Sequence, residues 1–150
     1  MSMDYNPTPG LVLPSYHLYY AAPAKIVESA EGGIVVWRVS IDTGGWRRQD
    51  EILFELLFAG AGYDIVRIPP ARFVQEVEAY RGDYLSGEGP IFALYETVEA
   101  IVDAAQRENR NLTERESALV EGIRRKTFVM FEEQLQQQGD PGADPTIADS

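Results

Sequence analysis

The spacing of the apolar residues changes near the middle of this chain, and that change limits the folds open to it. In the first half, apolar side chains alternate with others, most clearly in the β-branched segment Ile34–Ile41. In the second half they recur every three or four residues, as they do between Ile91 and Ala105. A period of two is typical of a half-buried strand, and a period of 3.6 is typical of an amphipathic helix. The chain is therefore expected to begin as a sheet and to end as helices.

The first half predicts a small antiparallel sheet. Glu31-Gly32-Gly33 is a turn, and the segments on either side of it are expected to pair as a hairpin. A Pro-Pro pair at residues 69 and 70 stops the last strand, because proline cannot donate to a sheet ladder. The expected strands are Tyr16–Ala22, Lys25–Ala30, Ile34–Ile41 and Tyr63–Ile68.

Helices are expected from residue 50 onward. Residues 50–59 are apolar nearly all round, which predicts a buried helix, with a strand as the alternative. Further helices are expected from Pro70 to Tyr80, after Pro90, and after Thr113, where Thr113 and Glu116 have the spacing of a capping box. The predicted fold class is α+β: a small antiparallel sheet from the N-terminal half packed against three to four helices from the C-terminal half.

The ends of the chain differ from its middle. Residues 1–15 contain several prolines and predict an extended, proline-rich arm. Residues 139–150 lack any core-forming periodicity and predict a disordered acidic tail. Residues 16–138 are expected to form a single domain, because a segment of this length is of ordinary size for one hydrophobic core.

Composition excludes several kinds of chemistry. The 150 residues include no cysteine and one histidine, His17, so disulfides, thiolate catalysis and multi-histidine metal sites are excluded, and no cofactor is expected. The formal net charge of −11 repels nucleic acids and anionic membranes and favours a basic protein partner, unless it serves only solubility. No signal-peptide pattern and no long apolar run is present, which predicts a cytoplasmic protein.

One short motif carries a resemblance to a known enzyme family. Asp42-Thr43-Gly44 follows a β-branched strand and resembles the Asp-Thr-Gly element of retroviral-type aspartic proteases. The resemblance implies that Asp42 would share a proton with a second carboxylate, which another copy of the chain would supply. It covers only about five residues, and those enzymes are nearly all-β. The alternative is a glycine-rich turn in which Asp42 bonds to nearby backbone N–H groups.

Three groups of residues are candidates for contact with a partner. Trp46, Arg47 and Arg48 lie on an expected loop, and tryptophan and arginine are enriched at binding hot spots. The alternative is that Trp46 folds over the core while the arginines pair with nearby carboxylates. The tyrosine-rich segment and the basic cluster of the last helix complete the set, although the basic cluster is also explained by pairing with Glu121 and Glu132. The candidates are Trp46, Arg47, Arg48, Tyr16, Tyr19, Tyr20, Arg124 and Arg125.

These observations favour a non-enzymatic protein-interaction module. It would be either an acidic inhibitor or immunity-type protein that covers a basic partner, or a small accessory subunit of a larger assembly such as a phage particle. Self-association stays open. The alternative is a small hydrolase, or a ligand- or metal-binding protein, that uses Asp42, Asp50 and Glu51.

Overall fold

The predicted α+β class is confirmed by a computed structural model that describes residues 12–58 and 64–150. A five-stranded antiparallel sheet comes from the first half of the chain, and the longer helices come from the second half. Most of the predicted proline-rich arm, residues 1–11, lies outside the described residues. The remainder of that arm ends in the first strand, which begins at Ser15.

The sheet has the strand order β4-β3-β2-β1-β5, so the first hairpin lies at its centre. β4 and β5 form its two edges, and every neighbouring pair is antiparallel. The predicted hairpin around Gly32 is present as β2 and β3. The strands are β1 (Ser15–Tyr19), β2 (Ala22–Glu28), β3 (Ile34–Val39), β4 (Trp46–Arg48) and β5 (Ile65–Ile68).

The prediction of one strand over residues 16–22 is wrong, because the chain turns inside that segment. Tyr19 pairs with Ala22, which leaves Tyr20 and Ala21 as a two-residue hairpin loop. Both loop residues have positive φ values, 49° and 69°. Such a turn normally carries Asn-Gly, because other residues are strained in the left-handed region. The sequence lacks that signature at residues 20 and 21. The prediction from alternating apolar residues therefore extended the strand through the turn.

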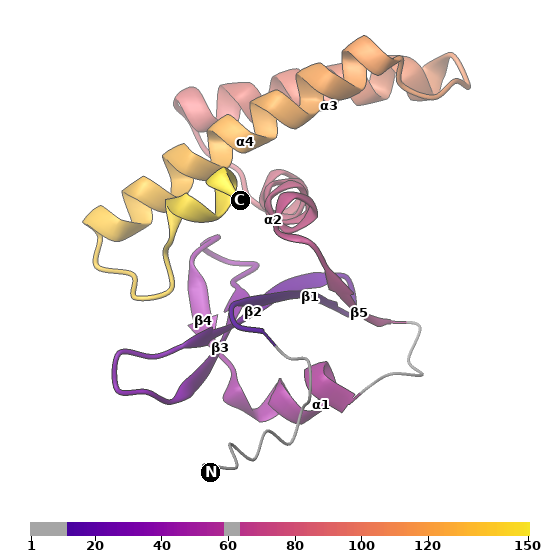
Figure 1. Cartoon of the computed structure of the whole chain (residues 1–150). Coiled ribbons are helices and arrows are strands. Elements are labelled where there is room, and N and C mark those ends of the chain that lie inside the picture. Colours follow the sequence, from indigo (N-terminus) through magenta and orange to yellow (C-terminus); the bar gives the residue numbers. More distant parts are fainter. Residues whose placement is uncertain (1–11, 59–63) are drawn as a thin grey trace.

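The helices form layers of unequal thickness on the two faces of the sheet (Figure 1). The longer helices cover one face, and α1 lies below the other. The predicted capping box is present, since Thr113 and Glu116 exchange side-chain-to-backbone hydrogen bonds at the start of α4. Among the described residues, none of the helices combines the length and apolar character needed to cross a bilayer. The helices are α1 (Leu53–Phe58), α2 (Pro70–Tyr84), α3 (Pro90–Arg107) and α4 (Glu114–Gln137), with short 3₁₀ turns η1 (Asp50–Ile52) and η2 (Pro145–Asp149).

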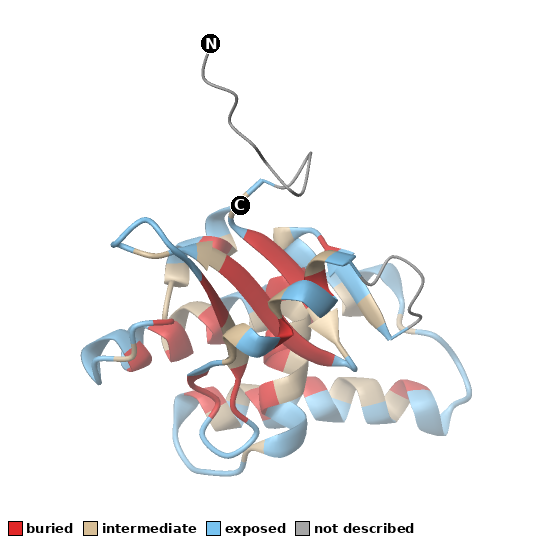
Figure 2. Cartoon of the chain, turned by 90° about the horizontal axis from the view of Figure 1, so that it is seen from below, coloured by how far each residue is buried: buried red, intermediate tan, exposed pale blue. Residues whose placement is uncertain are grey.

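Two separate hydrophobic clusters lie on the two faces of the sheet. The larger one fills the space between the sheet and helices α2–α4 and includes Phe73, Phe128 and Ile147. The smaller one joins Ala24, Ile26 and Val36 of the sheet to the turn and helix that follow β4. Residues 50–59 were predicted to be a buried helix, and α1 is instead a short surface helix with one buried residue, Leu56. Figure 2 views this face and shows buried central strands behind exposed helical surface.

The C-terminal segment also differs from its prediction. Residues 139–150 were expected to be a disordered tail, but they fold back and contact both α2 and α4 through η2. Ile147 is buried there, and Asp144 caps the turn by accepting a hydrogen bond from Thr146 N. The segment has a single large apolar residue, so no periodicity marks it as part of the core. Hydrogen bonds to buried charged groups, described below, hold the rest of it.

We expect Ile147→Ala to lower the free energy of unfolding by about 2–4 kcal/mol, because it opens a cavity in the larger cluster. Urea denaturation followed by circular dichroism measures the change. The matched control is Leu119→Ala on α4, whose side chain is 52% exposed and whose loss should change stability by less than about 0.5 kcal/mol. Equal effects of the two substitutions would show that the C-terminal segment adds nothing to the core.

Candidate functional site

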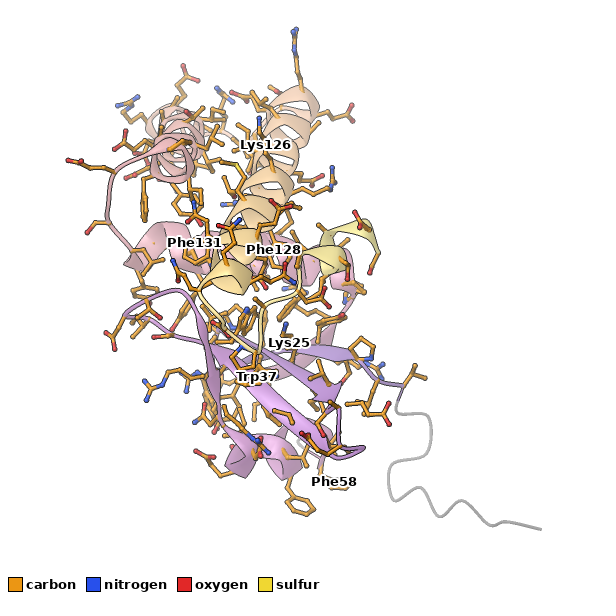
Figure 3. All side chains as sticks on the ribbon, turned by 90° about the vertical axis from the view of Figure 1, so that its left-hand side faces the viewer. Lys25, Trp37, Phe58, Lys126, Phe128 and Phe131 are labelled. Atoms are coloured by element: carbon orange, nitrogen blue, oxygen red, sulfur yellow. The ribbon has the colours of Figure 1, made fainter. Side chains whose placement is uncertain are left out.

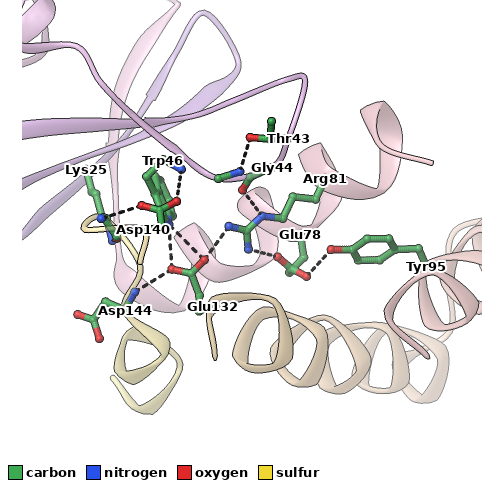
Figure 4. A network of polar contacts seen from close by, with 12 residues as sticks. Lys25, Thr43, Gly44, Trp46, Glu78, Arg81, Tyr95, Glu132, Asp140 and Asp144 are labelled. Atoms are coloured by element: carbon green, nitrogen blue, oxygen red, sulfur yellow. Dashed lines mark hydrogen bonds and ion pairs between the residues drawn. The ribbon is translucent and has the colours of Figure 1, made fainter. Parts of the chain in front are cut away.

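A network of buried charges lies between the sheet and the helices (Figure 4). At its centre is Arg81 of α2, whose side chain is completely buried. Its guanidinium donates to the Glu78 carboxylate at 2.9 Å, to the Glu132 carboxylate at 2.6 Å and to the Gly44 carbonyl at 2.9 Å. These partners come from α2, α4 and the loop between β3 and β4. One cation therefore joins three parts of the fold.

Glu132 extends the network toward the sheet and the C-terminal segment. Its carboxylate accepts hydrogen bonds from Trp46 Nε1 at 3.0 Å and from the backbone N–H of Asp144 at 2.9 Å. Asp140 accepts from the backbone N–H of Trp46 at 2.9 Å. On the sheet, Lys25 Nζ donates to the Gly142 carbonyl at 2.5 Å and lies 4.2 Å from the centre of the Trp46 ring. Residues 139–150 are thus held by hydrogen bonds to buried polar groups, which would otherwise have no partner.

The electrostatics of the network follow from burial and from the balance of its charges. Burial raises the pKa of Glu78, while Arg81 and a hydrogen bond from Tyr95 oppose that rise. Burial also lowers the pKa of Lys25 to about 8, against the opposing attraction of Glu132. For Arg81, burial alone would lower the pKa, but Glu78 and Glu132 hold it above its ordinary value. The cations Lys25 and Arg81 lie among carboxylates from α2, α4 and the C-terminal segment, so attraction between opposite charges offsets part of the cost of burial.

The loop that contains Asp42-Thr43-Gly44 supports this network. Gly44 has a φ of +75°, and a Cβ there would lie 2.6 Å from both Leu85 and Phe131. The glycine therefore lets the loop approach α2 closely enough for its carbonyl to accept from Arg81. The alternative to the protease resemblance was a glycine-rich turn in which Asp42 bonds to nearby backbone N–H groups. In the structure Ser40 has that role, because its Oγ accepts hydrogen bonds from the N–H groups of Asp42 and Thr43. Asp42 is exposed.

Two of the predicted contact residues belong to the core. Trp46 is 7% exposed, because its indole packs over the network and donates to Glu132. The alternative, in which Trp46 folds over the core, is the arrangement found. Tyr16 is also buried, with its ring 4.7 Å from that of Phe73. Neither side chain is available at the surface of this fold.

The predicted arginines lie in two separate places. Arg47 and Arg48 are exposed on the edge strand β4, and Arg48 pairs with Asp50 at 2.8 Å. Arg125 is exposed on α4, whereas Arg124 lines a cavity of about 360 Å³ between α2, α3 and α4. The pairing with Glu132 that was considered for this cluster does not form, because Glu132 points inward to Arg81.

Of the remaining predicted residues, Tyr19 contacts α1, and Tyr20 packs against Tyr19. Their rings meet edge to face at 4.7 Å, and Tyr19 donates to the Glu55 carboxylate of α1 at 2.6 Å. On α1 itself, Phe54 and Phe58 stack on each other with ring centroids 5.9 Å apart. Figure 3 shows Phe58 projecting away from the molecule, whereas Phe128 and Phe131 lie between α4 and the sheet. We call Tyr19, Tyr20, Phe54 and Phe58 the aromatic surface.

The carboxylates considered for hydrolysis or metal binding are not gathered at one point. Asp50 accepts from the backbone N–H of Val36 at 3.0 Å as well as from Arg48, and these contacts hold the pKa of its carboxyl below the ordinary value. Within residues 12–58 and 64–150, no three acidic or histidine side chains are close enough to hold a metal ion. His17 lies buried on β1, where its Nε2 meets Ser15 Oγ at 2.9 Å.

Sequence reasoning missed the network and the two phenylalanines. Glu78 and Arg81 are spaced as an ordinary surface pair on a helix, although they follow Val74 and Val77 on the inward side. Glu132 likewise lies one turn from Phe128 on the buried stripe of α4. Charges that fall on an apolar stripe are the signal that could have found the network. The phenylalanines were noticed only as part of an apolar run.

Comparisons with known proteins leave the function to be argued from this geometry. No model of a known protein family matches the chain, and no curated protein or solved structure matches it either.

We expect Arg81→Met to lower the free energy of unfolding by about 3–5 kcal/mol, because it removes the cation that pairs directly with two buried carboxylates. The matched control is Arg72→Met, which removes an exposed pair with Glu76 on the same helix and should cost less than about 1 kcal/mol. Both are measured by urea denaturation.

A triple variant separates charge from packing. Arg81→Met combined with Glu78→Gln and Glu132→Gln keeps the carbonyl acceptors but removes all three charges. It should be more stable than Arg81→Met alone. A triple variant less stable than the single one would contradict the electrostatic explanation.

Protonation of His17 should destabilise the protein in acid. Burial lowers the pKa of His17 to about 4 from its ordinary 6.5, with a smaller contribution from Arg67. Between these values the unfolded chain takes up a proton that the folded protein does not. Stability present above pH 6.5 is therefore lost by about 1.4 kcal/mol per pH unit as the pH falls toward 4. The difference in free energy of unfolding between wild type and His17→Gln should change with this slope between pH 6.5 and pH 4, because carboxyls such as Asp50 contribute equally to both proteins. Parallel curves would contradict the prediction.

Proposed function

We propose that this protein is a non-enzymatic interaction module that binds a basic partner protein through its aromatic surface. One observation carries the proposal: Phe54 and Phe58 are 73% and 56% exposed, and they stack beside each other on one short helix. A pair of large, exposed aromatic rings costs solubility in a free protein, whereas at an interface such rings supply much of the binding energy.

The strained turn between β1 and β2 is a second support. Tyr20 and Ala21 occupy the left-handed region, at a cost of roughly 1–2 kcal/mol per residue. Asn and Gly would relieve most of that strain, yet the turn carries a tyrosine whose ring is 60% exposed. Strain that the fold does not need is most often retained at functional positions. The turn places Tyr20 against Tyr19, and Tyr19 in turn contacts α1.

Charge selects the kind of partner. The segment that forms η1 and α1 contains Asp50, Glu51 and Glu55 and no cation. The whole chain has a net charge of −11, which accelerates the approach of a basic protein. A partner with Lys or Arg around an apolar depression would place its cations against Glu51 and Glu55. Both the acidic inhibitor and the assembly subunit require a surface of this kind.

The test compares four versions of the chain in capture from extracts of cells that naturally produce it. Phe54→Ser/Phe58→Ser should reduce the affinity for the captured partner by a factor of about 30 or more, as loss of hot-spot residues does. Tyr20→Asn/Ala21→Gly should weaken binding while it raises the free energy of unfolding by about 1–2 kcal/mol. Opposite changes in stability and affinity cannot arise from misfolding. Wild type and Leu119→Ser, which alters an exposed apolar residue on α4, should bind alike.

The partner is then purified, and its affinity is measured at low and high salt. An affinity that falls with added salt supports a basic partner, because salt screens the attraction between exposed charges. Binding that both double variants leave unchanged, or an affinity equal at both salt concentrations, would overturn the proposal. So would a homodimer that the phenylalanine substitutions dissociate, since a second acidic copy would then cover the surface.

A further inference from the structure

A second surface feature lies where β3 meets the edge strand β4, and it adjoins the aromatic surface, since the Arg38 guanidinium lies 5.8 Å from the centre of the Tyr19 ring. A cavity of about 240 Å³ opens there, and three arginines line it: Arg38, Arg47 and Arg48. Gln49 and Ser40 contribute further hydrogen-bonding groups to the lining. Arg38 is half-buried, and the other two arginines are exposed. We call this cavity the arginine pocket.

The arginines are placed against the usual rules of sheet pairing. Arg38 lies directly opposite Arg47 in the register of β3 and β4, where like charges destabilise a sheet. Arg38 donates to the uncharged side-chain oxygen of Gln49 at 3.2 Å. Arg47 forms no ion pair with any residue that the structure describes. Of the three arginines, Arg48 pairs with a carboxylate within residues 12–58 and 64–150, that of Asp50. Arg38 and Arg47 therefore carry like charges at directly opposite strand positions, and neither belongs to an ion pair in the described part of the chain.

This concentration of positive charge stands out in a chain with 24 acidic and 13 basic residues. Charges farther away than about 10 Å are largely screened at moderate salt, so an anion in the pocket responds mainly to its lining. Glu51 is the one carboxylate of that lining and Asp50 pairs with Arg48, so three arginines face two nearby carboxylates.

We propose that the arginine pocket binds a phosphate group, either as free phosphate or as the phosphate of a small metabolite. Arg38 and Arg47 lie directly opposite each other on neighbouring strands, so their side chains share one face and both guanidinium groups can donate to one tetrahedral oxyanion. A planar carboxylate is already satisfied by one bidentate arginine. A volume of about 240 Å³ holds a phosphate with a small organic group, which would contact Ile41 and Tyr80 of the lining.

The test titrates the ¹⁵N-labelled protein with inorganic phosphate at constant ionic strength, set with sodium chloride, and follows the amide resonances. The backbone signals of Ser40, Arg47 and Gln49 should shift and saturate. Arg47→Gln should weaken phosphate binding by roughly tenfold, because it removes a charge-assisted donor. Arg47→Lys keeps the positive charge but loses the planar set of guanidinium donors, so its affinity for phosphate should lie between those of the wild type and Arg47→Gln. Arg115→Gln, an exposed arginine on α4, is the matched control and should bind as the wild type does.

A variant that binds phosphate more tightly is a further control, because a gain in affinity cannot result from misfolding. Glu51→Gln removes the one carboxylate from the lining and should tighten phosphate binding about two- to threefold. A parallel titration with glycerol 3-phosphate identifies the source: tighter binding than phosphate assigns the site to a small phosphorylated metabolite, and equal or weaker binding assigns it to free phosphate. Acetate at the same ionic strength should not saturate.

Shifts of equal size in Arg47→Gln and wild type, or with chloride alone, would overturn the proposal. So would acetate binding as tight as phosphate binding. Neither result would bear on the aromatic surface, because Arg47 is not part of it. Conversely, Phe54→Ser/Phe58→Ser should leave phosphate binding unchanged.

Discussion

The complete burial of the Arg81 guanidinium is the constraint on which most of this structure depends. A guanidinium does not lose its proton in a protein, so burial of Arg81 requires carboxylates and carbonyls at fixed places around it. Those groups come from α2, α4 and the β3–β4 loop, which fixes the helices relative to the sheet. Glu132 then needs donors for its second oxygen, and Trp46 and the C-terminal segment supply them. The position of residues 139–150 is thus a consequence of satisfying one buried cation.

This dependence explains how far the sequence could predict the fold. Periodicity reports which faces are apolar, and it identified most of the sheet and the three longer helices, while the spacing of Thr113 and Glu116 identified the cap. It missed β4, whose residues Trp46–Arg48 were expected to form a loop. It could not identify Glu78 and Arg81 as buried, because two opposite charges three residues apart on a helix are normally exposed. It also gave no reason to order residues 139–150, where Ile147 is the only large apolar side chain. Their order comes from polar contacts with partners distant in sequence.

The same limit applies to the candidate site. The run around Phe54 is apolar nearly all round, and the simplest reading of such a run is burial in the chain's own core. The sheet face beneath α1, however, offers only a small apolar area that includes Ala24, Ile26 and Val36. Ile52 and Leu56 cover that area, and the opposite side of α1 stays exposed. Trp46 was misjudged in the opposite direction, because its burial depends on Glu132, which lies far away in sequence.

The fold separates the groups that stabilise it from the groups that we propose to bind. The charged network and the larger cluster lie between the sheet and α2–α4, on the face away from α1 (Figure 1). The aromatic surface and the arginine pocket lie at α1 and at the margins of the sheet, where local rules of stability are broken. Tyr20 sits in a turn that favours Asn, Phe54 faces solvent, and Arg38 lies opposite Arg47. A bound ligand or partner would relieve conflicts of this kind, and their presence at these two places supports the two binding proposals.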